Sequence, residues 1–574
     1  MRTFETSYDE ETNTFLKWAV TIYRINTYFM KRVLYITSLS LLCFFSCTPK
    51  KQAPTKPKLV VGIVIDQMRY DYLTRFASKY GADGFQRLLN NGFSLENAHY
   101  NYMPTYTAVG HTSIYTGATP TNHGVISNNW YDKKEKKSIY CVDDNSYQTI
   151  GSAGDAGKKS PKRLVTTTIT DQLRLAQNMR GKTIGIALKD RSAILPVGHT
   201  ANAAYWFHGG NEGVWVSSSF YMNSLPTWVQ EFNKNGTAND YLNQPWETLY
   251  DIETYTESIA DDNNFEQVFE GEAKPVFPHD IKELRKTNKN YSLLKAIPAG
   301  NSFTTDFAKA AIKHEQLGMS DATDFLAISY SSPDYVGHIF GVASKEIEDT
   351  YIRLDNDLAD LFRFLDKQVG KDNYTLFLTA DHAAVEVPSY LQSVKIPANY
   401  FSYTAFKAHL NKATKRLFKS ELIIENVSNF QIFLNKEKIS SLHLDSDQVA
   451  QKIADVAMEY PAIYKAVTAR TLQTTTFTHG ILHTLQNGYN QKFSGDVLLV
   501  PSPATVSYPK KGTTHGSGYS YDTHVPIIFY GNGIQQGSSK KKYEITDIAP
   551  TLANLLQIEF PNGNTGKIIE EVLE

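Results

Sequence analysis

Short apolar runs rich in β-branched residues alternate with helical patterns along most of this chain. The runs are typical of buried strands and cover residues 58–66, 182–188, 324–331, 374–380 and 525–531. Helical patterns between them include residues 84–92, 166–179 and 348–370. Strands that alternate with helices predict an α/β fold, with a mostly parallel central sheet and flanking helices.

Residues 390–500 depart from this alternation. They indicate a helix, strands, a second helix and a further strand, so we expect a small α+β insertion within a main domain over residues 58–574. Residues 204–222 indicate a hairpin, which either governs substrate access or covers an edge of the sheet.

The first 57 residues form a leader, a signal peptide and a linker. Basic Lys31 and Arg32 precede an apolar stretch, Val33 to Phe45, which is too short to span a membrane and is typical of a secretory signal. We expect Met30 rather than Met1 to be the natural start, in which case residues 1–29 would be an extension of the reading frame. A polar Pro/Lys linker follows.

Cys47 ends a segment that is similar to a bacterial lipobox, which predicts lipid attachment at this cysteine. The alternative is an ordinary signal that is cleaved nearby. We therefore expect an exported protein, located in the periplasm or anchored to the outer membrane as a lipoprotein. Any membrane contact would be made only through the lipid on Cys47.

Charge and cysteine content exclude several classes of function. The formal net charge is -1, so no overall field favours nucleic acid as a partner. With three cysteines in 574 residues, neither a disulfide framework nor a Cys-rich zinc site is available. A metal would have to bind histidines and carboxylates.

Acidic and imidazole side chains follow three of the expected strands, and one more histidine lies just before the last strand. They are Asp66, Asp334, His338, Asp381, His382 and His515. Ligands of open α/β sheets bind beyond the carboxyl ends of the strands, so we expect these groups to meet at one edge.

Each of these residues also has an ordinary explanation. An Asp at a strand end is commonly a helix N-cap, and Asp334 with His338 could form only a local hydrogen bond. Together, however, three Asp and three His without Cys suit catalytic zinc. Six ligands divide into two metals with three ligands each, which is the arrangement of phosphoryl-transfer sites.

Residues 102–112 are rich in hydroxyl groups and lead into a helical pattern. In isolation, Thr105 or Thr107 would be interpreted as a helix N-cap. Next to two metals, Thr107 is instead a candidate nucleophile, because a bound metal would convert its hydroxyl to an alkoxide. The helix N-terminus would bring backbone N–H groups to a phosphoryl group.

Five motifs occur in an order that resembles the alkaline phosphatase superfamily. They are VVGIVIDQMR, PTYTAVGHTSIYTGATPTNHG, SPDYVGH, TADH and HGSGYSYDTHVPIIFYG, and the resemblance spans roughly residues 58–560. A Thr nucleophile is typical of the branch that holds the PafA-type single-chain alkaline phosphatases and the nucleotide pyrophosphatase/phosphodiesterases. Sulfatases are excluded, because their C/S-x-P-x-R motif is missing.

The resemblance implies two Zn²⁺ ions per chain and assigns their ligands. Asp66, Asp381 and His382 would hold the zinc that activates Thr107. The second zinc, which stabilises the leaving group, would be held by Asp334, His338 and His515. His524 is a rival to His515, but His515 is followed by the glycine of the family's His-Gly signature.

Substrate choice depends on three further residues. Lys189 and Arg191 follow a buried strand, and in an extended segment both would point to one phosphoryl group while Asp190 faces away. The alternative is a solvated charge triplet. The PafA-type branch has such a Lys-x-Arg pair and an Asn matched by Asn128, with Asn129 as the alternative. These groups favour a monoester dianion over a diester.

We therefore expect an exported alkaline phosphatase that hydrolyses small phosphate monoesters through a phosphothreonine at Thr107, as a monomer. A phosphodiesterase or nucleotide pyrophosphatase with the same two-zinc site is the alternative. A lipoprotein that keeps the fold only as a binding module is a third hypothesis, and zinc content would distinguish it.

Overall fold

The computed structural model describes residues 9–44 and 56–574, and its contacts divide the chain into two units, Met1–Thr55 and Lys56–Glu574. In the first unit the helix α1 (Asp9–Phe44) includes Lys31, Arg32 and most of the expected apolar stretch. Cys47 and most of the linker lie outside the described residues. Within the described ranges, no helix combines the length and apolar character needed to cross a bilayer.

The second unit is built on a sheet to which ten strands of the described chain contribute. In spatial order they are β18 (Gly537–Glu544), β2 (Phe93–His99), β17 (His524–Gly531), β10 (Tyr374–Thr379), β1 (Leu59–Ile65), β9 (Asp324–Tyr330), β6 (Thr183–Ala187), β7 (Ala203–His208), β8 (Val214–Ser218) and β5 (Thr149–Ile150).

The centre of this sheet is parallel. Strands β10, β1, β9, β6 and β7 run in one direction, whereas β17 and β8 flank them antiparallel. Strand β1 is buried along its whole length, as a central strand covered on both faces must be. The five strands expected from the sequence are neighbours in the sheet, and each ends within one residue of its expected range. The predicted α/β fold is confirmed.

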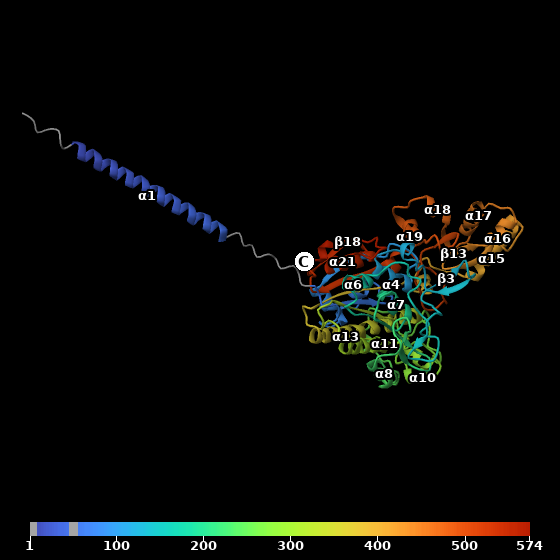
Figure 1. Cartoon of the computed structure of the whole chain (residues 1–574). Coiled ribbons are helices and arrows are strands. Elements are labelled where there is room, and N and C mark those ends of the chain that lie inside the picture. Colours follow the sequence, from blue (N-terminus) through green and yellow to red (C-terminus); the bar gives the residue numbers. More distant parts are fainter. Residues whose placement is uncertain (1–8, 45–55) are drawn as a thin grey trace, which may run out of the picture. The chain divides into compact units, whose positions relative to one another are not determined.

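Two groups of helices pack around this sheet (Figure 1). The first group comprises α4 (Thr107–Thr116), α6 (Ile169–Ala176), α7 (Asp190–Val197) and α21 (Ile548–Leu556). The second comprises α3 (Phe85–Asn91), α11 (Ala299–His314), α12 (Ser332–Phe340) and α13 (Lys345–Gln368). Helices α4 and α12 matter most for function, because they begin at the carboxyl edge of the parallel strands.

Residues 399–506 contain a second sheet, in which the described strands are β12 (Ile424–Ser428), β13 (Gln431–Leu434), β15 (Val497–Pro501) and β14 (Ile463–Thr468). All three of its pairings are antiparallel. Helices α15 (Tyr403–Phe418) and α17 (Ser446–Met458) bury their apolar faces in a hydrophobic cluster separate from the main core. These elements lie together in orange in Figure 1. The sequence did not predict strand β14.

The expected hairpin at residues 204–222 is formed by β7 and β8. It belongs to the main sheet, because β7 pairs in parallel with β6, and β8 continues to the short edge strand β5.

Candidate active site

Three neighbouring strands deliver acidic side chains to one edge of the sheet. Asp66 directly follows β1, and Asp381 follows β10, which pairs with β1 in parallel. Asp334 lies in the first turn of α12, immediately after β9 on the other side of β1. The three carboxylates therefore meet because their strands are adjacent and parallel, as the strand-end pattern predicts.

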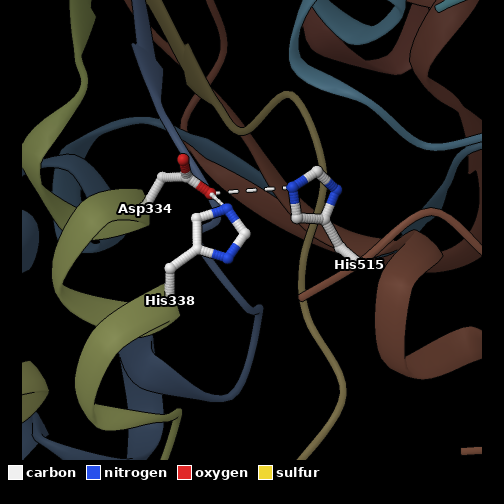
Figure 2. A group of neighbouring side chains, drawn as sticks. All are labelled: Asp334, His338 and His515. Carbon is white, nitrogen blue, oxygen red and sulfur yellow. Dashed lines mark ion pairs between the residues drawn. The ribbon is translucent and has the colours of Figure 1, made fainter. Parts of the chain in front are cut away.

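Asp334, His338 and His515 form the first group of side chains with metal-ligand geometry. Asp334 and His338 lie four residues apart on α12, and the His338 Nε2 atom is 3.1 Å from the Asp334 Oδ1 atom. His515 comes from a distant loop and places its Nε2 atom 3.7 Å from the same oxygen. Figure 2 shows both imidazoles turned toward this carboxylate.

Asp66, Asp334 and His382 form the second group, so Asp334 borders both. The His382 Nε2 atom lies 3.5 Å from Asp66 Oδ1 and 3.6 Å from Asp381 Oδ2. All six side chains that the sequence singled out as ligands are thus within one cluster.

Backbone carbonyls fix the orientation of the three histidines. The Nδ1–H groups of His338, His382 and His515 donate to the carbonyls of Thr513, Ala383 and Thr105, at 2.8, 3.1 and 2.6 Å. A carbonyl oxygen only accepts, so each ring carries a proton on Nδ1 and directs its Nε2 atom into the cluster. This arrangement is typical of metal-binding histidines.

Several buried polar atoms of the cluster have no hydrogen-bond partner among the described residues. They are Asp66 Oδ1, Asp381 Oδ2 and His382 Nε2, and all three side chains are fully buried. Orphaned buried polar groups cost free energy unless something binds them. Their position at one point, together with the mixed carboxylate and imidazole donors, fits a divalent transition metal.

The charges of the cluster agree with this interpretation. Burial and the nearby Asp381 carboxylate raise the pKa of Asp66 well above its usual range, and burial raises the pKa of Asp381 to about 7. Burial lowers the pKa of His515 to about 3, which keeps this imidazole neutral and able to act as a ligand. Further positive charge beside the cluster would favour the ionised forms of Asp66 and Asp381.

Lys189 lies between two of the acids. Its ammonium nitrogen is 2.7 Å from Asp66 Oδ2 and 2.5 Å from Asp334 Oδ2, and its side chain is almost fully buried. Burial would raise the pKa of Asp334, but His338 and Lys189 hold it well below its usual range.

Thr107 is the first residue of α4, whose N-cap is Tyr106, so the helix-cap explanation for Thr107 is wrong. It is 1% exposed, and the Arg191 Nη2 atom approaches its hydroxyl oxygen at 3.5 Å. Thr105 also has another role, because its hydroxyl donates to the Ser517 carbonyl at 2.9 Å.

Asn128 lies at the same helix terminus. Its amide oxygen accepts the Ala108 N–H at 2.8 Å, so its NH₂ group faces away from that bond. Its neighbour Asn129 is exposed at the start of strand β3 (Asn129–Asp132). The structure therefore places Asn128, and not Asn129, beside Thr107.

The extended segment expected for residues 189–191 is wrong. Lys189 is extended, but α7 begins at Asp190, so Arg191 lies in the first turn of a helix. Both cations nevertheless reach the site, and Arg191 is held there by the Tyr140 hydroxyl, which accepts from its Nη1 atom at 3.1 Å.

His524, the rival ligand, lies in β17 away from the cluster. Its Nε2 atom contacts the Glu96 carbonyl at 3.0 Å, and its ring stacks between Tyr70 and His99.

Sequence reasoning missed two residues of the site. Gln67 has a positive φ of 66°, and its side chain donates to Asp334 Oδ1 at 2.7 Å while its backbone N–H donates to Asp381 Oδ1. His111, one turn after Thr107, donates from Nδ1 to the Thr107 carbonyl at 2.9 Å and lies 3.3 Å from Asp381. Because Thr107 and His111 are four residues apart in a helical pattern, they lie on the same helix face, and this spacing could have indicated His111 as a site residue.

Metal-ligand groups at the carboxyl edge of a parallel sheet, beside a threonine at a helix N-terminus, define an enzyme of the alkaline phosphatase superfamily. Within this superfamily the chain belongs to the type I phosphodiesterase / nucleotide pyrophosphatase family, whose sequence pattern matches residues 60–525.

Curated relatives match almost the whole chain. A Myroides odoratus protein named calcium-transporting ATPase is 45% identical over 540 residues, which cover 93% of this chain and 98% of the relative. The alkaline phosphatase PhoV of Synechococcus elongatus is 44% identical over 553 residues, which cover 95% and 100%.

A solved structure is also closely similar. The crystal structure of the alkaline phosphatase PafA, an enzyme of Elizabethkingia meningoseptica, superposes with a TM-score of 0.88 at 42% identity, and the match covers 91% of this chain and all of that chain. A second PafA structure carries substitutions of a threonine, an asparagine, a lysine and an arginine, the last two separated by one residue.

Proposed function

We propose that this protein is an exported zinc-dependent alkaline phosphatase that hydrolyses phosphate monoesters through a phosphothreonine at Thr107. The observation that carries the proposal is the position of the Thr107 hydroxyl. It lies at the N-terminus of α4 with the Arg191 guanidinium 3.5 Å away, at the edge of the sheet where both ligand groups gather.

The residues of the cluster fit two zinc ions. Asp66, Asp381 and His382 would hold one, since both carboxylates have an oxygen within 3.6 Å of His382 Nε2. Asp334, His338 and His515, which have metal-ligand geometry, would hold the other. Bound zinc would supply a Lewis acid that lowers the pKa of a hydroxyl and offsets charge on the leaving oxygen.

The chain's own groups then account for the chemistry. The Thr107 oxygen forms a bond to phosphorus as the bond to the leaving oxygen breaks, and the hydroxyl proton leaves with the alcohol. Water next attacks the phosphothreonine, which releases inorganic phosphate and restores the Thr107 hydroxyl.

Donors at the helix terminus would hold the non-bridging oxygens. Arg191 is restrained by Tyr140, and the bond from the Ala108 N–H to the amide oxygen orients Asn128, whose NH₂ group would donate to the phosphoryl group. With metal bound to the acids, Lys189 would add a further positive charge beside the phosphoryl group. Such preorganised donors stabilise charge that develops in the transition state.

The comparison with PafA supports this assignment. The four residues replaced in the second PafA structure follow the same order as Thr107, Asn128, Lys189 and Arg191, with the same single residue between the lysine and the arginine.

A phosphodiesterase is the second candidate function, because the matching family is named for diester and pyrophosphate hydrolysis. The positive charges of Lys189 and Arg191 do not favour a diester substrate. A monoester dianion carries more charge on its non-bridging oxygens than a diester, so Lys189 and Arg191 benefit the monoester more.

The decisive measurement is the ratio of kcat/KM for an aryl phosphate monoester to that for the matching diester, with zinc-loaded protein at mildly alkaline pH. We expect the monoester to be preferred by about 10²-fold or more. Arg191→Ala should lower kcat/KM for the monoester by about 10²-fold and affect the diester less. A preference for the diester would assign the protein to the phosphodiesterase branch.

The matched control is Arg180→Ala, which removes an exposed arginine that follows helix α6 and donates from its Nε atom to the Gln177 carbonyl. It should leave both rates unchanged. Equal losses on monoester and diester in Arg191→Ala would contradict the proposal that Arg191 favours the monoester dianion.

A further inference from the structure

A cavity of about 350 Å³ opens beside the proposed phosphoryl site. Lys189 and Arg191 form the wall that it shares with that site, and Tyr335, next to Asp334, borders it as well. Another part of the lining comes from the end of β7, where Phe207 lies. The cavity thus occupies the carboxyl edge of the parallel strands, adjacent to the position of the scissile bond.

Four cations line this cavity, and two of them are neutralised. Lys159 forms ion pairs with Asp143 and Asp190, and Lys189 bridges Asp66 and Asp334. In the described part of the chain, no ion pair joins the side chain of Arg191 or Lys295 to a carboxylate, although Asp190, which pairs with Lys159, also borders the cavity and lies beside Arg191. The charges of Arg191 and Lys295 are therefore not compensated by an ion pair, and the four lining cations outnumber the one lining carboxylate.

The two uncompensated cations have different positions. Arg191 reaches the Thr107 hydroxyl, where the phosphoryl group of the substrate would lie. Lys295 belongs to the 3₁₀-helix η3 (Asn290–Ala296), and its ammonium nitrogen is 5.9 Å from the centre of the Phe207 ring. Arg191 can thus bind the reacting phosphate, while Lys295 can bind a second negative group.

The aromatic side chains and the volume of the cavity are also compatible with a ring-shaped leaving group. Tyr335 and Tyr140 are half-buried and border the cavity, and the volume lies within the range of small-molecule sites, about 300–1,000 Å³. An aryl- or sugar-sized leaving group fits such a space.

We propose that this cavity receives the leaving group of the substrate and that Lys295 binds a second anionic group on it. The favoured substrates would be phosphate monoesters whose ring-sized leaving group carries a carboxylate or a further phosphate. The inference rests on the proposed monoesterase function and assigns Lys295 a role in specificity, outside the group transfer itself.

The test compares phenyl phosphate with 3- and 4-carboxyphenyl phosphate at fixed ionic strength. Lys295→Met keeps the length of the side chain and removes its charge. We expect it to lower kcat/KM by about tenfold for the better carboxylated substrate and by less than about twofold for phenyl phosphate. The ratio of variant to wild type cancels differences in leaving-group chemistry between the substrates.

Inhibition gives a second measurement that is independent of turnover of the carboxylated esters. Hydroxybenzoate, the product alcohol, should inhibit the wild type more strongly than phenol does, and Lys295→Met should remove this difference. Lys295→Arg should retain both effects, because it keeps the positive charge.

The matched control is Lys289→Met, which removes an exposed lysine six residues earlier that does not border the cavity. Equal losses on all substrates in Lys295→Met, or the same selective loss in Lys289→Met, would overturn the inference while leaving the proposed function intact. Failure of the wild type to hydrolyse phenyl phosphate would instead overturn the proposed function, and the inference with it.

Discussion

Thr107 illustrates how neighbours determine the chemistry of a residue. In the sequence it resembles a helix cap, yet in the structure Tyr106 occupies the N-cap position. The hydroxyl of Thr107 instead faces Arg191, and the Thr107 carbonyl accepts from His111. Burial lowers the pKa of His111 to about 4, so this imidazole is a neutral donor that positions the first turn of α4.

Replacing Thr107 should separate catalysis from metal binding. We expect Thr107→Ala to lower kcat by at least about 10³-fold, because the proposed nucleophile is lost, while zinc content stays near that of the wild type. Turnover of an aryl phosphate and elemental analysis of the purified protein check both parts.

The conservative variant is the control. Thr107→Ser keeps a hydroxyl at the same position and should retain far more activity than Thr107→Ala. Near-normal turnover by Thr107→Ala would show that another group attacks phosphorus.

At the scale of elements, the site depends on how closely α4 approaches the end of β10. A Cβ atom on Gly110 would lie 2.1 Å from the Asp381 carbonyl oxygen. Backbone contacts of this kind do not relax through a side-chain rotation, so the helix and the strand end would have to separate. Glycine at this position lets Thr107 and Asp381 lie in one site.

Gly110→Ala should therefore impair both metal binding and turnover. We expect overpacking to reduce the free energy of unfolding by about 1–3 kcal/mol and to lower zinc occupancy, because α4 moves relative to Asp381. Denaturant titration and elemental analysis measure these effects. Gly154→Ala is the control, since a Cβ there meets nothing within 4 Å, and an equal effect there would refute the packing argument.

A second element-scale feature supports α12, which carries Asp334 and His338. The Gln267 N–H donates to the Ile339 carbonyl of this helix at 2.9 Å, and the adjacent Glu266 is buried near Glu346. Burial and the Glu346 carboxylate raise the pKa of Glu266 to about 10. Glu266 is therefore protonated in the folded protein at neutral pH.

This raised pKa gives a pH dependence with a definite sign. Between the unfolded pKa near 4.3 and the folded pKa near 10, the folded state binds one more proton at Glu266, so the free energy of unfolding falls as pH rises. Glu266→Gln should flatten this slope over pH 5–9 by up to about 1.4 kcal/mol per pH unit. Denaturant titrations at several pH values measure it.

The control for this prediction is Glu283→Gln, which changes an exposed carboxylate on helix α10 (Ile281–Leu284). The free energy of unfolding of Glu283→Gln should change with pH as steeply as that of the wild type. An unchanged slope in Glu266→Gln would mean that Glu266 is ionised in the folded protein.

At the scale of the whole molecule, the catalytic unit is described from Lys56 onward, and the proposed lipid attachment at Cys47 lies outside the described residues. We expect Cys47→Ser to move phosphatase activity from the membrane fraction to the soluble fraction of cells. Cell fractionation and mass spectrometry of the N-terminal peptide test this. The same distribution in wild type and variant would favour simple cleavage of the signal.

The second sheet adds a self-contained layer to the molecule. It has its own hydrophobic cluster, and Asn429 from its β12–β13 turn donates to the Asn129 carbonyl, next to Asn128. The sequence indicated most of its elements but missed β14, because "IYKAVT" alternates only weakly between buried and exposed positions.

The sequence alone determined four strands of the parallel core, β1, β6, β9 and β10, and the three Asp and three His of the cluster. Apolar runs such as 58–66 and 374–380 are local signals, and the acids that follow them mark one sheet edge whatever the rest of the chain does. The resemblance to the family indicated Asn128 and kept Asn129 as the alternative.

Only the tertiary structure decided how the cluster is arranged. It places Asp334 on the border of both ligand groups and Lys189 between two acids, and it brings Gln67 into the site. It also places His515 in the cluster and His524 outside it, although the two residues are only nine apart in the sequence. These outcomes depend on side-chain distances between segments hundreds of residues apart, which arise from long-range packing and leave no local pattern in the sequence.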